Sequence, residues 1–158
     1  MLRKIKDIKN ALKSESYMSA LALTLTLPDI CGKVVYPELN SGERYKKWYD
    51  EYITKYNENN CILNAEKCYK LRCAYLHEGS IKDIPEIDEF EFRVSRSSGE
   101  TGGVSSFSEL WIDTEKKRKE IRLDIKQFCF EIYQAAENFY EEKRNDKVFS
   151  DDHITFLD

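Results

Sequence analysis

The feature that most constrains the fold is a stripe of apolar side chains in the last third of the chain. The stripe recurs every three or four residues and consists of Ile121, Ile125, Phe128, Ile132, Ala136 and Phe139. A repeat of this period places the side chains on one face of an α-helix. The sequence therefore predicts one long helix over about 114–144, with its apolar face buried against other helices.

Two more helices are predicted near the N-terminus. The first spans Met1–Lys13, where apolar residues recur at helical spacing opposite a face of lysines. The second spans about 16–31 and is rich in Ala, Leu and Met, although a period-two run of leucines leaves a buried strand as the alternative. We expect Pro28 to kink or end this helix and Gly32 to terminate it.

Another two helices are predicted in the middle of the chain. Ser41 is expected to cap the third helix, which carries an aromatic stripe made up of Tyr45, Trp48, Tyr49, Tyr52, Ile53 and Tyr56. A continuous aromatic face is costly to expose to water, so we expect it to form core rather than a base-stacking platform. Asn64 is expected to cap a fourth helix over about 65–78, with Gly79 as its left-handed terminator.

The pattern changes between about 86 and 113. Residues 88–95 alternate between apolar and charged side chains, which is typical of a half-exposed strand, and 104–113 form a weaker second strand. The serine- and glycine-rich residues 97–103 provide a turn between them, so the two strands are predicted to form a β-hairpin. The expected fold class is mainly α, a single domain of about five bundled helices with this hairpin inserted.

Composition excludes some classes of function. The net charge of −4 gives no overall basic field for nucleic acid, so any RNA contact needs a local patch. The five cysteines include no CxxC pair and predict free thiols in a reducing cytoplasm, with no structural zinc and no cofactor. The apolar run Ala20–Leu27 is too short to span a bilayer. We therefore expect a cytoplasmic protein that does not enter the membrane.

Residues suited to catalysis gather at the end of the fourth predicted helix. Arg72 and His77 are separated by four residues in the segment Leu71–Gly79 (LRCAYLHEG). This segment resembles the motif of the HEPN family of small helical proteins, in which a histidine follows an arginine after four to six residues. The upstream ALALTLTLPDICGK and the aromatic stripe are similar to a bacterial branch of that family. The resemblance covers about 16–79 and the last helix, and leaves the hairpin unexplained.

The resemblance implies a metal-independent endoribonuclease of bacterial defence or toxin type, which leaves a cyclic phosphate and builds its site at a homodimer interface. In that role Arg72 would clamp the phosphate, since arginine is always charged and matches phosphate oxygens. His77 would be the general acid or base, since histidine titrates near neutral pH. The structural alternative is that Arg72 pairs with a carboxylate and His77 bonds to carbonyls at the helix end.

Geometry limits how the two residues can meet. On a straight α-helix, Arg72 and His77 point about 140° apart, so they cannot form a side-by-side pair. Three arrangements remain: the arginine wraps around the helix, the helix opens near Gly79, or two copies of the segment face each other across a two-fold axis. The resemblance favours the last arrangement.

Three residues are expected to support the site. Cys73 stands where many members of the family carry a polar residue, often Asn, directly after the arginine. Asp29 lies beside an apolar run, and either pairs with Arg72 or is a turn carboxylate in water. Glu78 adjoins His77. The toxin branch that is silenced by nucleotide transfer carries a tyrosine where this chain has Gly79, so that form of regulation is not expected.

A cluster of basic residues opens the predicted last helix and is the local candidate for contacts with the RNA backbone. It consists of Lys116, Lys117, Arg118, Lys119 and Arg122. The alternative is an ordinary solvated helix face. The expected partners are a second copy of the chain, RNA and a neutralising antitoxin protein. The alternative function is a non-catalytic HEPN-like module that binds RNA, a nucleotide or a partner protein.

Overall fold

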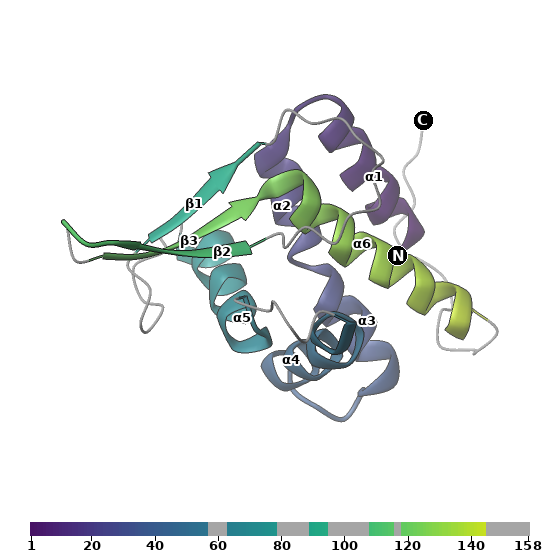
Figure 1. Cartoon of the computed structure of the whole chain (residues 1–158). Coiled ribbons are helices and arrows are strands. Elements are labelled where there is room, and N and C mark those ends of the chain that lie inside the picture. Colours follow the sequence, from purple (N-terminus) through teal and green to yellow (C-terminus); the bar gives the residue numbers. More distant parts are fainter. Residues whose placement is uncertain (57–62, 79–88, 95–107, 116–117, 145–158) are drawn as a thin grey trace.

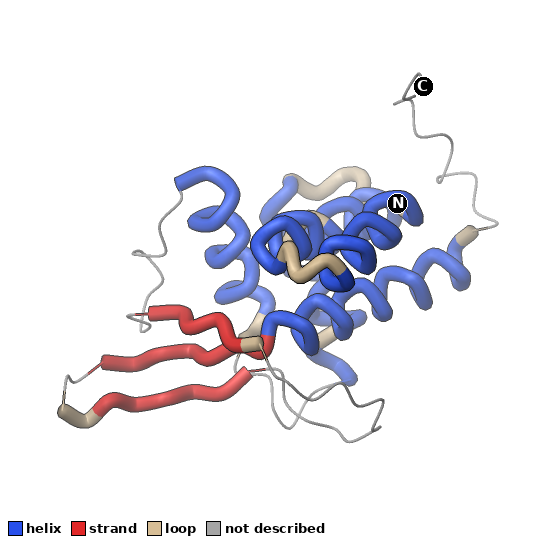
Figure 2. The backbone as a smooth tube through the Cα atoms, turned by 90° about the horizontal axis from the view of Figure 1, so that it is seen from above, coloured by secondary structure: helices blue, strands red, loops and turns tan. Residues whose placement is uncertain are grey.

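The fold is mainly α-helical, which confirms the predicted class (Figure 1). The computed structural model describes residues 1–56, 63–78, 89–94, 108–115 and 118–144. The helices are α1 (Leu2–Lys13), α2 (Tyr17–Thr24), α3 (Leu27–Val35), α4 (Ser41–Tyr52), a 3₁₀ turn (Thr54–Tyr56), α5 (Ala65–Cys73), a π turn (Ala74–Glu78) and α6 (Ile125–Lys143). The strands are β1 (Glu89–Arg93), β2 (Ser108–Asp113) and β3 (Arg118–Asp124). The strands lie side by side at one edge of the group of helices (Figure 2).

The predicted helix over 16–31 is two helices, α2 and α3. The break falls at Leu25 and Thr26, where the Thr26 hydroxyl donates to the carbonyl of Leu23 at 2.7 Å. Pro28 lies in the first turn of α3 and is the physical reason for the break. Proline lacks the N–H that would bond to the carbonyl four residues earlier, and its ring clashes there, but it is tolerated in a first turn.

The expectation that Gly32 ends a helix is wrong, because Gly32 lies inside α3. It serves the packing of α3 against α4 instead. A Cβ atom at Gly32 would lie 2.6 Å from the backbone oxygen of Arg44, which is closer than real Cβ atoms approach. The missing side chain therefore lets the two helices come close enough for their side chains to share partners.

The aromatic stripe of α4 forms core, as expected. Tyr45, Trp48 and Tyr49 have no exposed surface, and Trp48 packs edge-on against Phe139 of α6 with ring centroids 5.9 Å apart. The cap of α4 is Asn40 rather than the predicted Ser41. The Asn40 side chain accepts the backbone N–H of Glu43 at 3.0 Å, and the Glu43 carboxylate reaches back to the Asn40 N–H. The helix therefore begins at Ser41, one residue earlier than it would begin if Ser41 were the cap.

The strands pair differently from the prediction. In the sheet β3 lies between the other two strands, parallel to β1 and antiparallel to β2. The predicted hairpin between 88–95 and 104–113 is therefore wrong, and the hairpin joins β2 to β3. The predicted helix over 114–144 is also wrong before Ile125, because Arg118–Asp124 forms the strand β3 and α6 begins only at Ile125. Ile121 and Leu123 are buried and alternate with the charged residues Glu120, Arg122 and Asp124, a period-two pattern that forms β3.

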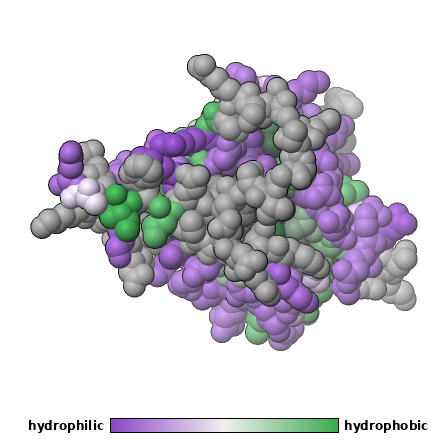
Figure 3. Space-filling model, viewed as in Figure 1, coloured by the Kyte–Doolittle hydropathy of each residue, from purple (hydrophilic) through white to green (hydrophobic). Residues whose placement is uncertain are grey.

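Asp124 separates the strand from the helix that follows it. Its carboxylate accepts the backbone N–H of Gln127 at 2.9 Å and so caps α6. From there on, the predicted apolar stripe is buried as expected. The far part of the β2–β3 hairpin extends beyond the helices (Figure 1). Hydrophobic side chains lie on the surface of this extension (Figure 3), where Leu110 and Ile112 are about half exposed.

Residues Tyr17–Val35 are long and apolar enough to cross a bilayer by length and composition alone. In the structure this segment contains the break between α2 and α3. Four of its apolar side chains, Ala20, Leu21, Leu25 and Leu27, have no exposed surface. The helices α2 and α3 both contact α6, so the apolar character of the segment is accounted for by the core.

Candidate functional site

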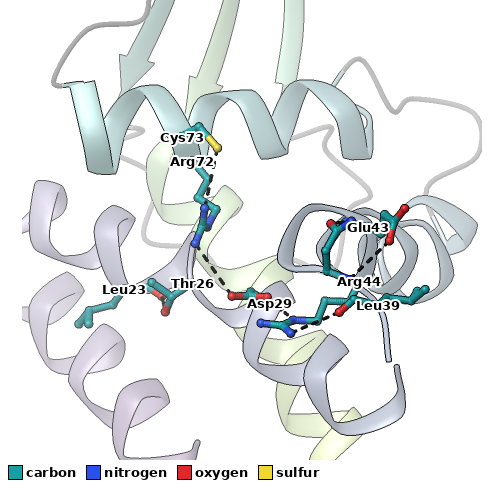
Figure 4. Close-up of polar contacts among 9 residues, drawn as sticks. Leu23, Thr26, Asp29, Leu39, Glu43, Arg44, Arg72 and Cys73 are labelled. Carbon is teal, nitrogen blue, oxygen red and sulfur yellow. Dashed lines mark hydrogen bonds and ion pairs between the residues drawn. The ribbon is translucent and has the colours of Figure 1, made fainter. Parts of the chain in front are cut away.

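The site lies on α5, whose start is fixed by a cap. The Asn64 side chain accepts the backbone N–H of Lys67 at 3.0 Å, as the sequence predicts. Cys68 and Leu71 are fully buried and hold one face of α5 in the core. Arg72 then lies on the side of α5 that faces α3 (Figure 4).

The last turn of the predicted helix over 65–78 is a π turn, Ala74–Glu78. Such turns have hydrogen bonds between residues five apart, are rare, and occur often at functional sites. The turn is tied down by Tyr75, whose hydroxyl donates to the carbonyl of Met18 in α2 at 3.1 Å. Gly79, the predicted terminator, lies outside the described residues. The helix therefore widens within the Arg72–His77 segment, before the glycine.

Arg72 points from α5 towards α3, where Asp29 lies (Figure 4). Its Nη2 atom is 4.0 Å from Oδ2 of Asp29, a long ion pair, and its guanidinium carbon is 5.7 Å from the centroid of the Tyr69 ring. The side chain is 16% exposed, and within the described part of the chain its Nε–H is buried without an acceptor. Arg72 is thus held in place by the Asp29 carboxylate and the Tyr69 ring, and its Nε–H donor has no acceptor among the described residues.

Asp29 is shared between two arginines. Its Oδ1 atom accepts the Nε–H of Arg44 at 2.6 Å, much closer than the contact with Arg72. Arg44 is the functional neighbour that sequence reasoning missed. No spacing rule indicates it, because the pair joins α3 to α4 across the close approach at Gly32. Two guanidinium groups around one carboxylate leave the cluster with an excess of one positive charge.

His77 is exposed on the π turn. Among the described residues it makes no hydrogen bond or ion pair, and the structure does not bring it into contact with Arg72. Arg72 is mostly buried against α3, whereas His77 is open to solvent. A single chain therefore presents the two residues separately.

Cys73 lies beside the guanidinium, with its Sγ atom 3.8 Å from Nη1 of Arg72. It is a half-buried thiol, whereas Cys31, Cys68 and Cys129 are buried. Burial raises the pKa of Tyr69, and a hydrogen bond with Cys73 raises it further, so the phenol stays neutral. The side chain of Glu78 lies outside the described residues. Cys73 is thus the expected supporting residue that touches Arg72 directly.

Of the predicted basic cluster, the structure describes the side chains of Lys119 and Arg122. Lys116 and Lys117 and the side chain of Arg118 lie outside the described residues, and Lys119 is exposed. Arg122 lies on β3 rather than on a helix, and its Nε atom is 2.7 Å from a carboxylate oxygen of Glu91 on β1. For Arg118, Lys119 and Arg122 the expectation that they open a helix is wrong, because Arg118–Asp124 is the strand β3.

Within the described residues, no three His, Cys, Asp or Glu side chains are arranged to hold a metal ion. A scan against protein-family models and searches of curated proteins and of solved structures found no match to this chain. The HEPN resemblance therefore depends on the residues of the motif and on the helical frame around it.

Proposed function

We propose that the protein is a metal-independent endoribonuclease of bacterial defence or toxin type, which acts as a homodimer. Arg72 is the phosphate clamp and His77 the general acid or base. The observation that carries the proposal is the environment of Arg72. Its guanidinium is positioned by Asp29 and Tyr69 but not neutralised, because Arg44 is the closer partner of that carboxylate.

The residues suit RNA cleavage by the neighbouring 2′-hydroxyl. His77 takes the proton from the 2′-hydroxyl, and the 2′ oxygen bonds to phosphorus. The charge of the phosphorane rests against Arg72, which can donate two N–H groups to its oxygens. The bond from phosphorus to the 5′ oxygen then breaks, and that oxygen takes up a proton from solvent. The products are a 2′,3′-cyclic phosphate and a 5′-hydroxyl.

A second copy of the chain would complete the site. Arg72 points towards α3 and is 16% exposed, whereas His77 is exposed on the π turn. Across a two-fold axis near this turn, each His77 would approach the phosphate held by the partner subunit's Arg72. Each dimer would then have two equivalent composite sites.

The second candidate is a HEPN-like module that binds RNA, a nucleotide or a protein without cleaving. It is favoured by the low exposure of Arg72 and its contact with Asp29, both expected of a structural arginine. The two candidates differ in whether the protein cleaves RNA with Arg72 and His77 or only binds its ligand.

The test is cleavage of single-stranded RNA in the presence of EDTA. We expect cleavage in the wild type and products that end in a cyclic phosphate. His77→Ala should abolish it, whereas His153→Ala, which removes the other histidine of the chain, should not. Lys70→Ala is the matched control for Arg72→Ala, because Lys70 is on the same helix but pairs with Glu66. Binding of RNA without cleavage by the wild type would establish the second candidate instead.

A further inference from the structure

A groove of about 490 Å³ lies between the turn that joins α1 to α2, the end of β1 and the start of α6. It is lined by residues 15–19 and by Phe92, Val94 and Ile125. Met18 and Val94 are 56% and 42% exposed, so apolar surface is open to solvent here.

Glu15 is held at this groove by an unusual backbone. The N–H of Ser16 bonds to the carbonyl of Ala11 at 2.8 Å, and the N–H of Glu15 bonds to that of Leu12 at 3.2 Å, which is a Schellman ending of α1. Glu15 takes the left-handed position of this motif, with φ of 59°. Glycine is the usual residue there because it has no Cβ. The chain instead has a glutamate among the residues that line the groove, on a backbone fixed by two hydrogen bonds.

Two aromatic residues, Tyr17 of α2 and Phe92 of β1, line the same groove. Aromatic rings bind the faces of nucleobases by stacking. The Nζ atom of Lys126, in the first turn of α6, lies 5.8 Å from the centroid of the Tyr17 ring. A cation in this position can meet a backbone phosphate while a base occupies the groove.

The groove is physically joined to the proposed site. Met18, which lines it, accepts the hydroxyl of Tyr75 through its carbonyl at 3.1 Å. Tyr75 belongs to the π turn and precedes His77 by two residues. One hydrogen bond therefore connects the groove to the turn that carries His77.

We propose that this groove binds a guanine base of the RNA substrate, with Glu15 as the residue that selects it. The inference depends on the proposed ribonuclease function and adds the base preference of the same site. Guanine has adjacent N1–H and N2–H donors on its Watson–Crick edge, and a carboxylate can only accept. Adenine, cytosine and uracil each place a ring nitrogen or carbonyl acceptor beside a single donor there, which a carboxylate repels.

The test measures binding separately from cleavage. The probes are fluorescein-labelled uridine hexanucleotides with 2′-O-methyl riboses, which cannot be cleaved, carrying a central guanosine, adenosine or uridine. At fixed low salt, fluorescence anisotropy should give a dissociation constant about tenfold lower for the guanosine probe than for the other two, as expected for hydrogen bonds to a charged group. Equal binding of the three probes, or an adenosine preference, would overturn the inference.

Two variants of Glu15 sharpen the test. Glu15→Gln keeps the shape and should reduce the guanosine preference to below about threefold, because one charged acceptor is lost. Glu15→Gly should remove the preference and raise the melting temperature, since glycine suits the left-handed position. Glu141→Gln, an exposed position near the far end of α6, is the matched control and should keep the preference. A preference that survives both Glu15 variants would rule out Glu15 as its source.

The outcomes also separate this inference from the proposed function. His77→Ala should lose cleavage but keep the guanosine preference, because His77 is not part of the groove. If the wild type cleaves RNA but binds the three probes equally, the guanine site in the groove is refuted and the ribonuclease proposal remains. A guanosine preference in a protein that never cleaves RNA would support the groove and overturn the ribonuclease.

Discussion

Arg44 on α4 and Arg72 on α5 contact the same carboxylate, yet their surroundings differ. Arg44 donates its Nε–H to Asp29 at 2.6 Å, and its Nη1 atom lies 3.5 Å from the carbonyl of Leu39. Arg72 is 4.0 Å from Asp29 and retains a buried Nε–H with no acceptor in the described residues. The exposed fractions are nearly equal, 18% and 16%, so burial does not distinguish them. This difference supports the proposed function, in which Arg44 has a structural role and Arg72 is available to an added anion.

The largest expected effect separates the two arginines. Arg72→Ala should lower the rate of RNA cleavage by about 10²- to 10³-fold, because it removes the cation that faces the phosphorane. Arg44→Ala should instead lower the free energy of unfolding by about 1–3 kcal/mol, since it leaves Asp29 without its close partner. Cleavage kinetics and urea denaturation on both variants measure this. Equal loss of stability in the two variants, with cleavage unaffected, would contradict the division of roles.

Gly32→Ala should affect both arginines at once. The added methyl group would lie 2.6 Å from the Arg44 carbonyl oxygen and would push α3 away from α4. Overpacking of this kind lowers the free energy of unfolding by about 1–3 kcal/mol. Gly42→Ala is a milder comparison, since the Cβ atom would approach the hydroxyl of the Tyr69 side chain at 3.0 Å. Urea denaturation that ranks Gly42→Ala as the more damaging change would refute the close approach at Gly32.

Replacement of Cys73 tests the immediate neighbour of Arg72. Cys73→Asn would place an amide oxygen near the guanidinium that the thiol now touches at 3.8 Å. An amide is a better acceptor than sulfur, so Arg72 should be better oriented, and cleavage should stay equal or rise by about threefold. Steady-state cleavage rates measure this. A loss of cleavage in a variant with an unchanged melting temperature would give the thiol itself a role.

The smallest expected effect is on the surface pair that ties α5 to α4. Lys46 donates a hydrogen bond to Glu66 at 3.0 Å and lowers the pKa of that carboxyl. A lowered pKa means that the pair stabilises the fold above the unfolded pKa and that this contribution is lost as pH falls through the folded value. The Lys46 and Glu66 side chains are 37% and 50% exposed, so Glu66→Gln should cost less than about 1 kcal/mol at pH 7. Denaturation curves should converge with those of the wild type near pH 3, and a constant difference would contradict the pairing.

The sequence predicted the helices better than the connections between elements. Periodicity located α1, α4 and α5 and the apolar face of α6, because one buried face of each has a regular spacing. Periodicity failed at Arg118–Asp124. Ile121 fits both the helical stripe and the period-two pattern of a strand, and the charged residues around it are compatible with either. Periodicity also did not predict the strand order, because β1 pairs with β3, which lies about thirty residues later in the chain.

The candidate site was predictable only in part. The proximity of Asp29 to Arg72 was one of two alternatives that the sequence left open, and the structure places them 4.0 Å apart. Arg44 could not be found, because its place beside Asp29 depends on a glycine that lets two helices meet. The π turn escaped prediction too, since helical periodicity does not distinguish a widened last turn from a regular one.

The most direct test of the composite site is to mix two inactive variants. Arg72→Ala chains keep His77, and His77→Ala chains keep Arg72, so a mixed dimer regains one composite site of its two. After subunit exchange at equal concentrations, cleavage should return to about a quarter of the wild-type rate, because half of the dimers are mixed. Failure to regain cleavage, with light scattering showing that mixed dimers form, would contradict a site shared between chains, as would a protein that stays monomeric.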